Sequence, residues 1–294
     1  MLMLLILATI LTVSSNQEFD EAFYNSLGPG YSYTYLQTPP TEKFYPSQSL
    51  LECSLIALNS QSEFFTYSKV NRTCKNYSPK NIMTVSSGQD KNEMSYYRSI
   101  EWIKTYAVSK GANSLIYNSV MNVGDPSTWN VDKCVGGYCP NFFRHPLLDI
   151  WNELPIDEVK LVLYENQTAV VTMVFDGRDT TLESWFSIDK LKSSPWSDLP
   201  VENTNYFSIA GFGDARRFYV SNHHRSCPYD IGWLCINEAN ERFETCPWET
   251  SNPFPAFHYS KSGSKTTWSK GIALADSMAI FIRLRQNQPI PVYV

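Results

Sequence analysis

The first half of the chain contains a helical pattern of apolar residues at 48–59. Over residues 48–59, apolar residues recur every three or four positions, which predicts a helix. Ser47 or Ser49 can cap its start. The apolar positions form a stripe with flanking residues, namely Leu51, Leu55 and Leu58 with Leu50, Cys53 and Ala57. The sequence therefore predicts a helix with one apolar face.

Short alternating patterns follow this helix. Apolar and polar side chains alternate over residues 64–68, 73–77, 82–85 and 94–100. Alternation with a period of two is typical of β-strands. Residues 100–108 are predicted to be partly helical, and the rest up to residue 133 loop-like.

From about residue 134 the pattern changes to repeated aromatic and β-branched alternation. Strands are predicted at 159–164, 169–175, 185–188, 206–210, 217–221, 232–236, 256–260 and 278–284. Turn-forming residues separate nearly all of them, including a bend at Gly211-Phe212-Gly213. Many short strands with polar connections favour an antiparallel β-sandwich or jelly-roll-like domain over residues 134–285. The predicted fold class is α+β, with a helix-plus-sheet module at 47–105 and a linker at 106–133.

The chain begins with an apolar run that is typical of a secretory signal peptide. Val13 and Ser15 suit the −3 and −1 positions of signal peptidase, so residues 1–15 are predicted to be removed. An uncleaved signal anchor is the alternative, but the run is shorter than the roughly 18–20 residues that cross a bilayer. Residues 16–46 show no sustained periodicity and are interpreted as an irregular leader, and 286–294 as a C-terminal tail. We therefore expect a secreted, extracellular protein with no membrane span after cleavage.

Charge narrows the range of partners. The chain has 24 Lys and Arg against 29 Asp and Glu, a formal net charge of −5. Its basic pairs, such as Arg216-Arg217, are isolated, whereas binding to phosphates needs clustered cations. We therefore do not expect the protein to bind nucleic acid.

The predicted compartment changes how the cysteines and sequons are interpreted. In a secreted chain, seven cysteines indicate a disulfide framework with one thiol left over. Cys134 with Cys139 would close a small loop. Sequons predict glycosylation at Asn71, Asn76 and Asn166, the last of which falls at the tip of a predicted hairpin.

Two parts of the chain resemble known extracellular proteins. The first resemblance, to a degenerate PAN/apple module, rests on Leu51-Glu52-Cys53-Ser54, Phe64-Phe65-Thr66-Tyr67, Thr73-Cys74 and Ser95-Tyr96-Tyr97-Arg98. It covers about 50 residues and lacks a second helix cysteine and a terminal pair. The second, to an uncharacterised family of secreted molluscan proteins, rests on an ordered series that includes Phe143-Arg144-His145-Pro146-Leu147, Arg216-Arg217-Phe218-Tyr219-Val220, Gly232-Trp233-Leu234 and Cys246-Pro247-Trp248-Glu249. Covering about half the chain, it implies an architecture and a compartment, but no activity.

These resemblances also imply disulfide pairings. In an apple-like module, Cys53 with Cys74 would pin the helix to a strand. The molluscan pattern implies Cys227 with Cys246, which leaves Cys235 single. Because Cys235 lies on a predicted strand, we expect a buried thiol there rather than an intermolecular bridge.

Known motifs for catalysis or metal binding are missing from the sequence. His223 and His224 are adjacent and would point to opposite sides of a strand, and there is no HExxH or paired CxxC spacing. Four aspartates on predicted loops match no calcium-binding loop: Asp176, Asp179, Asp214 and Asp230. A serine nucleophile motif is also missing. We therefore predict no enzyme activity, no catalytic residue, no metal and no cofactor.

The surplus of aromatic residues is the strongest functional signal. Three of them lie on predicted loops and are the candidate binding residues: Trp196, Tyr229 and Trp248. Exposed rings can stack on sugar faces or anchor a protein partner. We therefore predict a binding or adhesion protein that recognises a glycan or an extracellular protein. The alternatives are a structural component of an extracellular or shell-associated matrix and a hydrolase without a recognisable motif.

Overall fold

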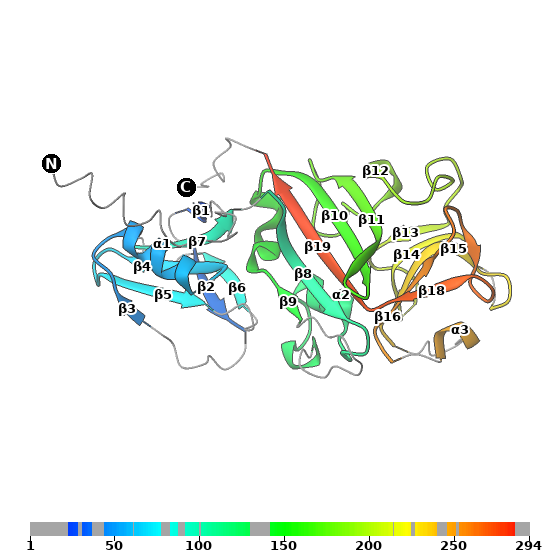
Figure 1. Ribbon diagram of the computed structural model, residues 1–294, viewed down its shortest axis with the longest axis horizontal. Helices are drawn as coiled ribbons and strands as arrows, with labels where there is room; N and C mark the ends of the chain where they lie inside the picture. The colour runs from blue at the N-terminus through cyan, green and yellow to red at the C-terminus, as the bar shows by residue number, and fades with distance from the viewer. Residues whose placement is uncertain are drawn as a thin grey trace, which may run out of the picture.

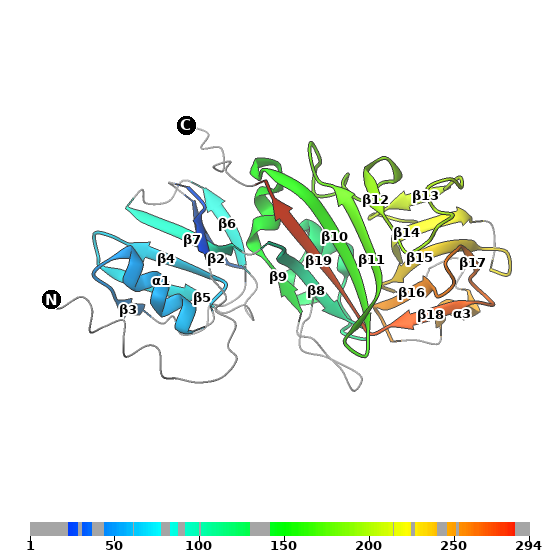
Figure 2. The ribbon, with the colours of Figure 1, turned by 45° about the horizontal axis from the view of Figure 1, so that its top comes forward.

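The computed structural model describes residues 23–28, 31–36, 44–60, 62–77, 83–87, 92–99, 101–129, 142–213, 215–224, 227–239, 246–250 and 253–285. The predicted signal peptide, the Cys134–Cys139 pair and the C-terminal tail lie outside these residues. Three layers follow one another along the molecule: the N-terminal module at one end, a central sheet and an outer sheet (Figures 1 and 2). None of the helices in the described ranges is long and apolar enough to span a membrane.

The N-terminal module consists of one helix and two antiparallel sheets. Its larger sheet has the order β1 (Phe23–Ser26), β7 (Glu93–Ser99), β4 (Phe64–Ser68), β5 (Thr73–Tyr77) and β3 (Phe44–Pro46). A two-stranded sheet is formed by β2 (Tyr31–Tyr35) and β6 (Met83–Ser87). Helix α1 (Leu50–Asn59) packs against β4 and β5. The predicted helix and the four predicted strands of this region are therefore confirmed.

Helix α1 buries a different face from its leucine stripe. Ser49 caps the helix by accepting from the Glu52 backbone N–H at 3.2 Å. The buried positions are the small residues Cys53 and Ala57, whereas Leu51 is 70% and Leu55 50% exposed. The Cys53–Cys74 disulfide joins the helix to β5 and selects its buried face, and the small side chains allow a close approach to the sheet.

The predicted irregular leader was wrong, because residues 23–46 supply three strands. β1 pairs with β7, β2 with β6, and β3 with β5, so every partner lies far along the chain. Tyr33 is buried, and its hydroxyl donates to the Tyr96 carbonyl at 3.0 Å. The alternation of Tyr31, Tyr33 and Tyr35 was the local signal for a strand, but long-range pairing stabilises it.

Two six-stranded antiparallel sheets form the rest of the described chain. The central sheet has the order β12 (Leu191–Ser193), β11 (Thr168–Asp176), β10 (Ile156–Glu165), β19 (Ser277–Leu284), β8 (Ile103–Ser109) and β9 (Phe143–Arg144). The outer sheet has the order β13 (Tyr206–Ser208), β14 (Arg216–His223), β15 (Ile231–Asn237), β16 (Ala256–Ser260) and β18 (Ile272–Ala275), with β17 (Thr266–Thr267) on β15. The same part of the described chain contains five short helices: α2 (Ile116–Met121), η1 (Pro126–Trp129), η2 (Pro146–Glu153), η3 (Ile188–Lys190) and α3 (Pro247–Thr250).

Two sequence predictions for this region were wrong. Residues 103–109, predicted to be partly helical and then linker, form β8 between β19 and β9. Residues 185–188, predicted as a strand, form a turn that leads into η3. The consecutive rings of Trp185 and Phe186 are both buried, and an extended strand would turn one of them away from the core.

Helix η2 joins the N-terminal module to the central sheet. The Thr84 hydroxyl of β6 donates to Asp149 at 2.7 Å, and the Tyr31 hydroxyl of β2 donates to Glu153 at 2.5 Å. The ring of His145, which precedes η2, meets that of Phe64 edge-on at 4.9 Å. One hydrophobic core therefore continues from the module into the two sheets.

Candidate functional site

The three loop aromatics occupy different environments. Trp196 is buried, and its indole N–H donates to the Ser260 carbonyl at 2.9 Å, so its expected surface position was wrong. Trp248 is only 9% exposed and stacks on Trp268, with 5.5 Å between the ring centroids. Tyr229 is 65% exposed. The two tryptophans are covered because the loops that carry them fold back onto the outer sheet, where burying a large ring stabilises the fold.

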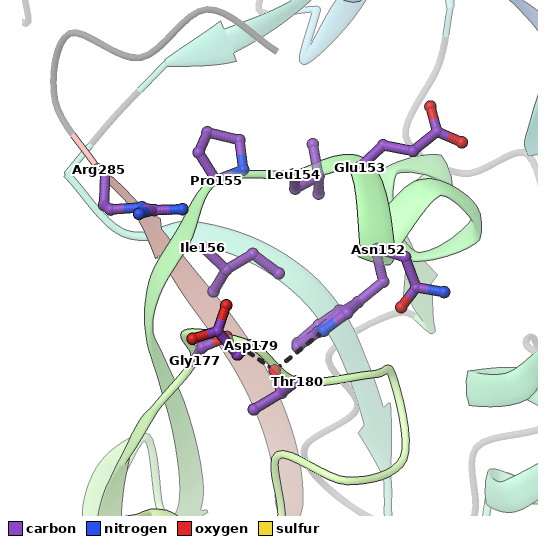
Figure 3. Close-up of a pocket in the computed structure, with 10 residues that line it drawn as sticks. Asn152, Glu153, Leu154, Pro155, Ile156, Gly177, Asp179, Thr180 and Arg285 are labelled. Carbon is purple, nitrogen blue, oxygen red and sulfur yellow. Dashed lines mark hydrogen bonds between the residues drawn. The ribbon is translucent and has the colours of Figure 1, made fainter. Parts of the chain in front are cut away.

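A small cavity lies beside η2, away from these aromatics. It has a volume of about 170 Å³ and opens between the end of η2, the start of β10 and the turn after β11 (Figure 3). The Trp151 indole N–H donates to the Thr180 hydroxyl at 3.2 Å, and that hydroxyl donates to the Gly177 carbonyl at 2.7 Å. A Cβ at Gly177 would lie 2.4 Å from Ile156, so this turn can approach β10 only with glycine. The cavity wall is therefore fixed by its own hydrogen bonds.

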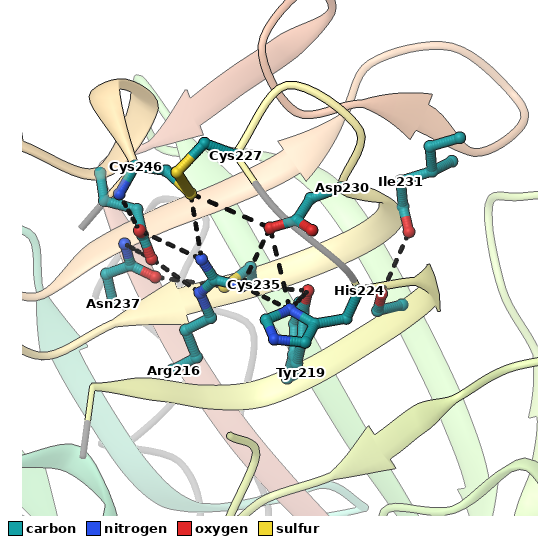
Figure 4. A network of polar contacts seen from close by, with 11 residues as sticks. Arg216, Tyr219, His224, Cys227, Asp230, Ile231, Cys235, Asn237 and Cys246 are labelled. Carbon is teal, nitrogen blue, oxygen red and sulfur yellow. Dashed lines mark hydrogen bonds and ion pairs between the residues drawn. A yellow bond between two sulfur atoms is a disulfide. The ribbon is translucent and has the colours of Figure 1, made fainter. Parts of the chain in front are cut away.

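A buried arginine organises the outer sheet. Arg216, the first residue of β14, donates from Nε and Nη2 to the two carboxylate oxygens of Glu249 at 2.7 and 3.1 Å (Figure 4). Its Nη1 donates to Asp230 at 3.1 Å. The side chains of these three residues are 3% exposed or less. A bidentate arginine with a second carboxylate compensates charges that would be costly to bury alone.

Charge and covalent bonds together hold the turn that carries Tyr229. The Cys227–Cys246 disulfide ties the start of the turn to the segment before α3, and the Asp230 ion pair ties its end. The Cys246 backbone N–H donates to Glu249 at 2.7 Å. The exposed ring of Tyr229 is therefore carried on a short turn that is fixed at both ends.

The two predicted disulfides that lie within the described residues are confirmed. Cys53–Cys74 and Cys227–Cys246 are both formed. Cys235 is buried on β15, outside both disulfides, and its Sγ lies 3.1 Å from the Asn237 side-chain oxygen.

Burial sets the charge state of the groups around Arg216. Burial is the largest single influence on the pKa of Arg216 and lowers it, but the hydrogen bond to Glu249 and the electrostatic attraction of neighbouring groups together raise it above its usual value, so the guanidinium stays charged. Burial also raises the pKa of Tyr219 above its usual value, which keeps the phenol neutral. Burial and the nearby Arg216 cation lower the pKa of His258 to about 3. At neutral pH, His258 is therefore an uncharged ring beside a charged arginine.

Partly exposed rings gather over this network. Tyr206 stacks on the buried Tyr219 at 5.4 Å, and the His224 ring lies 4.1 Å from that of Phe212. His224 Nδ1 lies 3.8 Å from Asp230, which adjoins Tyr229. We call the contacting rings of Tyr206, Phe212 and His224, together with Tyr229 on the turn next to them, the aromatic patch.

Glycine positions one of these rings. A Cβ at Gly211 would lie 1.9 Å from the Arg216 carbonyl oxygen, and Gly211 has a φ of +66°. The bend lets Phe212 exchange backbone hydrogen bonds with Arg216 at 3.0 and 3.3 Å. The sequence predicted this bend between two strands, but not the partly exposed Phe212 ring that it carries.

Metal ligands do not converge in the described ranges. No three His, Cys, Asp or Glu side chains there could hold one ion. Asp176 pairs with Arg178 and Asp230 with Arg216, while Asp214 lies outside the described residues. His145 and His258 are buried.

Comparisons with known proteins give no relative. No protein-family model matches the chain, and no significant match was found among curated proteins or solved structures. The resemblances to an apple module and to the molluscan family therefore stay predictions.

Sequence reasoning identified Tyr229 but missed the residues that support it. Arg216 and Glu249 were not singled out for pairing, because 33 residues separate them. A charged residue at the start of an apolar strand was the only local signal for Arg216.

Proposed function

We propose that this protein is a secreted binding protein that recognises a glycan through the aromatic patch. The observation that carries the proposal is a set of partly exposed rings held on a rigid support. Arg216, its two carboxylates and the Cys227–Cys246 disulfide fix the underlying backbone. Such preorganisation reduces the conformational entropy lost on binding.

The chemistry of the patch favours a glycan over a protein partner. Tyr229 and Phe212 are 65% and 37% exposed and offer apolar faces to sugar C–H groups. The hydroxyls of Tyr206 and Tyr229 supply hydrogen-bonding groups beside those faces. A few rings interspersed with polar groups suit one or two sugar units.

Compartment and architecture belong to the same proposal. The disulfides and the signal-like N-terminal sequence support an extracellular location. The α1-covered sheet supports an apple-like module, and the central and outer sheets support a sandwich-like second domain.

The binding proposal predicts a loss of affinity when exposed rings are removed. Tyr229→Ala and Phe212→Ala should each weaken glycan binding by about 1–2 kcal/mol, roughly five- to thirtyfold, as for an interface hot spot. The measurement is a glycan-array screen followed by titration of the best ligand. Phe44→Ala is the matched control, since this ring is 57% exposed in the N-terminal module. Equal binding by the Tyr229, Phe212 and Phe44 variants would contradict the proposal, and retention only on immobilised proteins would indicate a protein partner.

The three predicted glycosylation sites differ in their surroundings in the structure. Asn166 lies at the exposed β10–β11 hairpin tip, and Asn71 in the exposed turn after β4. Asn76 lies within β5, where its amide donates to the Ser60 hydroxyl at 2.7 Å, a bond with which a glycan on the same nitrogen would compete. We expect Asn166→Gln and Asn71→Gln each to remove one glycan mass from protein secreted by eukaryotic cells, and Asn76→Gln to remove none. Intact-mass spectrometry decides, and a glycan on Asn76 would show the expectation to be wrong.

A further inference from the structure

The cavity beside η2 is lined by two opposite charges that do not pair. Arg285 follows β19, and Asp179 lies in the turn after β11. Figure 3 shows Ile156 between them. Within the described chain, neither side chain takes part in a hydrogen bond or an ion pair. A cation and an anion held apart at one small space can bind complementary charges on a single molecule.

Size limits what the cavity can take. Its volume of about 170 Å³ would hold about six water molecules at about 30 Å³ each. This is below the roughly 300–1,000 Å³ of sites for drug-sized ligands. The cavity therefore suits a molecule of a few heavy atoms and is too small to enclose a sugar ring with its hydroxyl groups.

Three other polar side chains of the wall are already engaged. The Trp151 indole and the Thr180 hydroxyl bond to each other. The Glu153 carboxylate accepts from Tyr31 of the N-terminal module and points away from the cavity in Figure 3. The charge available to a ligand is therefore one guanidinium and one carboxylate, with an apolar surface between them.

We propose that this cavity binds the zwitterionic head of a small α-amino acid. The ligand carboxylate bonds to Arg285 and its ammonium group to Asp179, while its carbon atoms contact Ile156. The site is separate from the aromatic patch and does not depend on glycan binding.

Isothermal titration of the full chain with alanine tests this proposal, with propionate and ethylamine as probes that each carry one of the two charges. Alanine should bind saturably, and the two single-charge probes at least tenfold more weakly. Arg285→Gln and Asp179→Asn should each weaken alanine binding at least tenfold. The matched control is Arg178→Gln, since Arg178 is exposed in the same turn but does not line the cavity.

Three outcomes would overturn the proposal. They are no saturable alanine binding at tens of millimolar, propionate binding as tight as that of alanine, or equal binding by the Arg285, Asp179 and Arg178 variants. Unchanged melting temperatures would show that all three variants are folded, as expected for exposed side chains. Phe212→Ala should leave alanine binding intact, so failure of this proposal is distinguishable from failure of the glycan proposal.

Discussion

Replacing Arg216 with glutamine is expected to lower the free energy of unfolding by about 3–5 kcal/mol. The substitution removes the guanidinium that pairs with both Asp230 and Glu249, and both carboxylates are 1% exposed. It also removes the bidentate hydrogen bonds to Glu249 and the contact with the Trp248 ring, which lies 5.0 Å from the guanidinium carbon. Urea unfolding monitored by tryptophan fluorescence measures the change.

A surface arginine provides the matched control for this prediction. Arg178 also forms a bidentate pair with one carboxylate, that of Asp176, but its side chain is 55% exposed. Arg178→Gln should therefore change stability much less than Arg216→Gln does. Adding Asp230→Asn to Arg216→Gln should recover part of the loss, because one uncompensated buried charge is then removed. A loss of less than 1 kcal/mol for Arg216→Gln would mean that burial of the carboxylates is not as costly as the geometry indicates.

Acidification below pH 6.5 is expected to destabilise the fold through two buried histidines. Burial, with a smaller contribution from Arg144, lowers the pKa of His145 to about 3. Burial and Arg216 do the same for His258. His145 Nε2 and both ring nitrogens of His258 have no hydrogen-bond partner within the described ranges, so protonation gains no compensating contact.

The direction in which stability changes with pH follows from the histidine pKa values in the folded and unfolded chains. A histidine in the unfolded chain has a pKa of about 6.5, so between pH 6.5 and 3 the unfolded state binds more protons than the folded state. Stability is therefore complete above pH 6.5 and falls by about 1.4 kcal/mol per pH unit for each histidine as the pH is lowered. At pH 4.5 the two residues together would cost on the order of 5 kcal/mol.

Variants without these two histidines distinguish their contribution to the acid sensitivity from that of the carboxylates. His145→Asn keeps an acceptor for the Leu147 backbone N–H, which His145 Nδ1 accepts at 3.1 Å. His258→Phe keeps a ring to meet Trp248, which His258 contacts edge-on at 5.2 Å. The double variant should lose much less stability than the parent between pH 7 and 4.5 in urea unfolding. Identical losses would assign the acid sensitivity to other groups.

Local patterns predicted the long apolar strands well. β10, β11 and β19 were found at nearly their observed bounds because each is a long run of mainly apolar and β-branched residues. β14, predicted at 217–221, keeps the alternation of a strand, with Phe218 and Val220 in the main core and Tyr219 in the cluster beside Arg216. It also contains a bulge, where Phe218 adopts a φ of +43° and the register shifts between Arg217 and Val220. An irregularity of this kind cannot be inferred from a period of two.

At the candidate site, too, local sequence predicted some features and only contacts between distant segments decided the others. Tyr229 was found because proline, aspartate and cysteine neighbours indicate a turn at the surface. Trp196 and Trp248 have similar neighbours but are buried, since the exposure of a loop ring depends on what packs above it. The pairing of Arg216 with Glu249 and Asp230 required three separate segments to come together.

The sequence by itself determined the antiparallel β-rich character of the chain, helix α1 and most of its strands, because these depend on residues close along the chain. Only the tertiary structure decided which face of α1 is buried, that three strands, β1, β2 and β3, precede α1, and which aromatic rings reach the surface. Those outcomes depend on contacts between distant segments, such as β2 with β6 and Cys53 with Cys74. The free energy of such contacts comes from burial and pairing that no local pattern records.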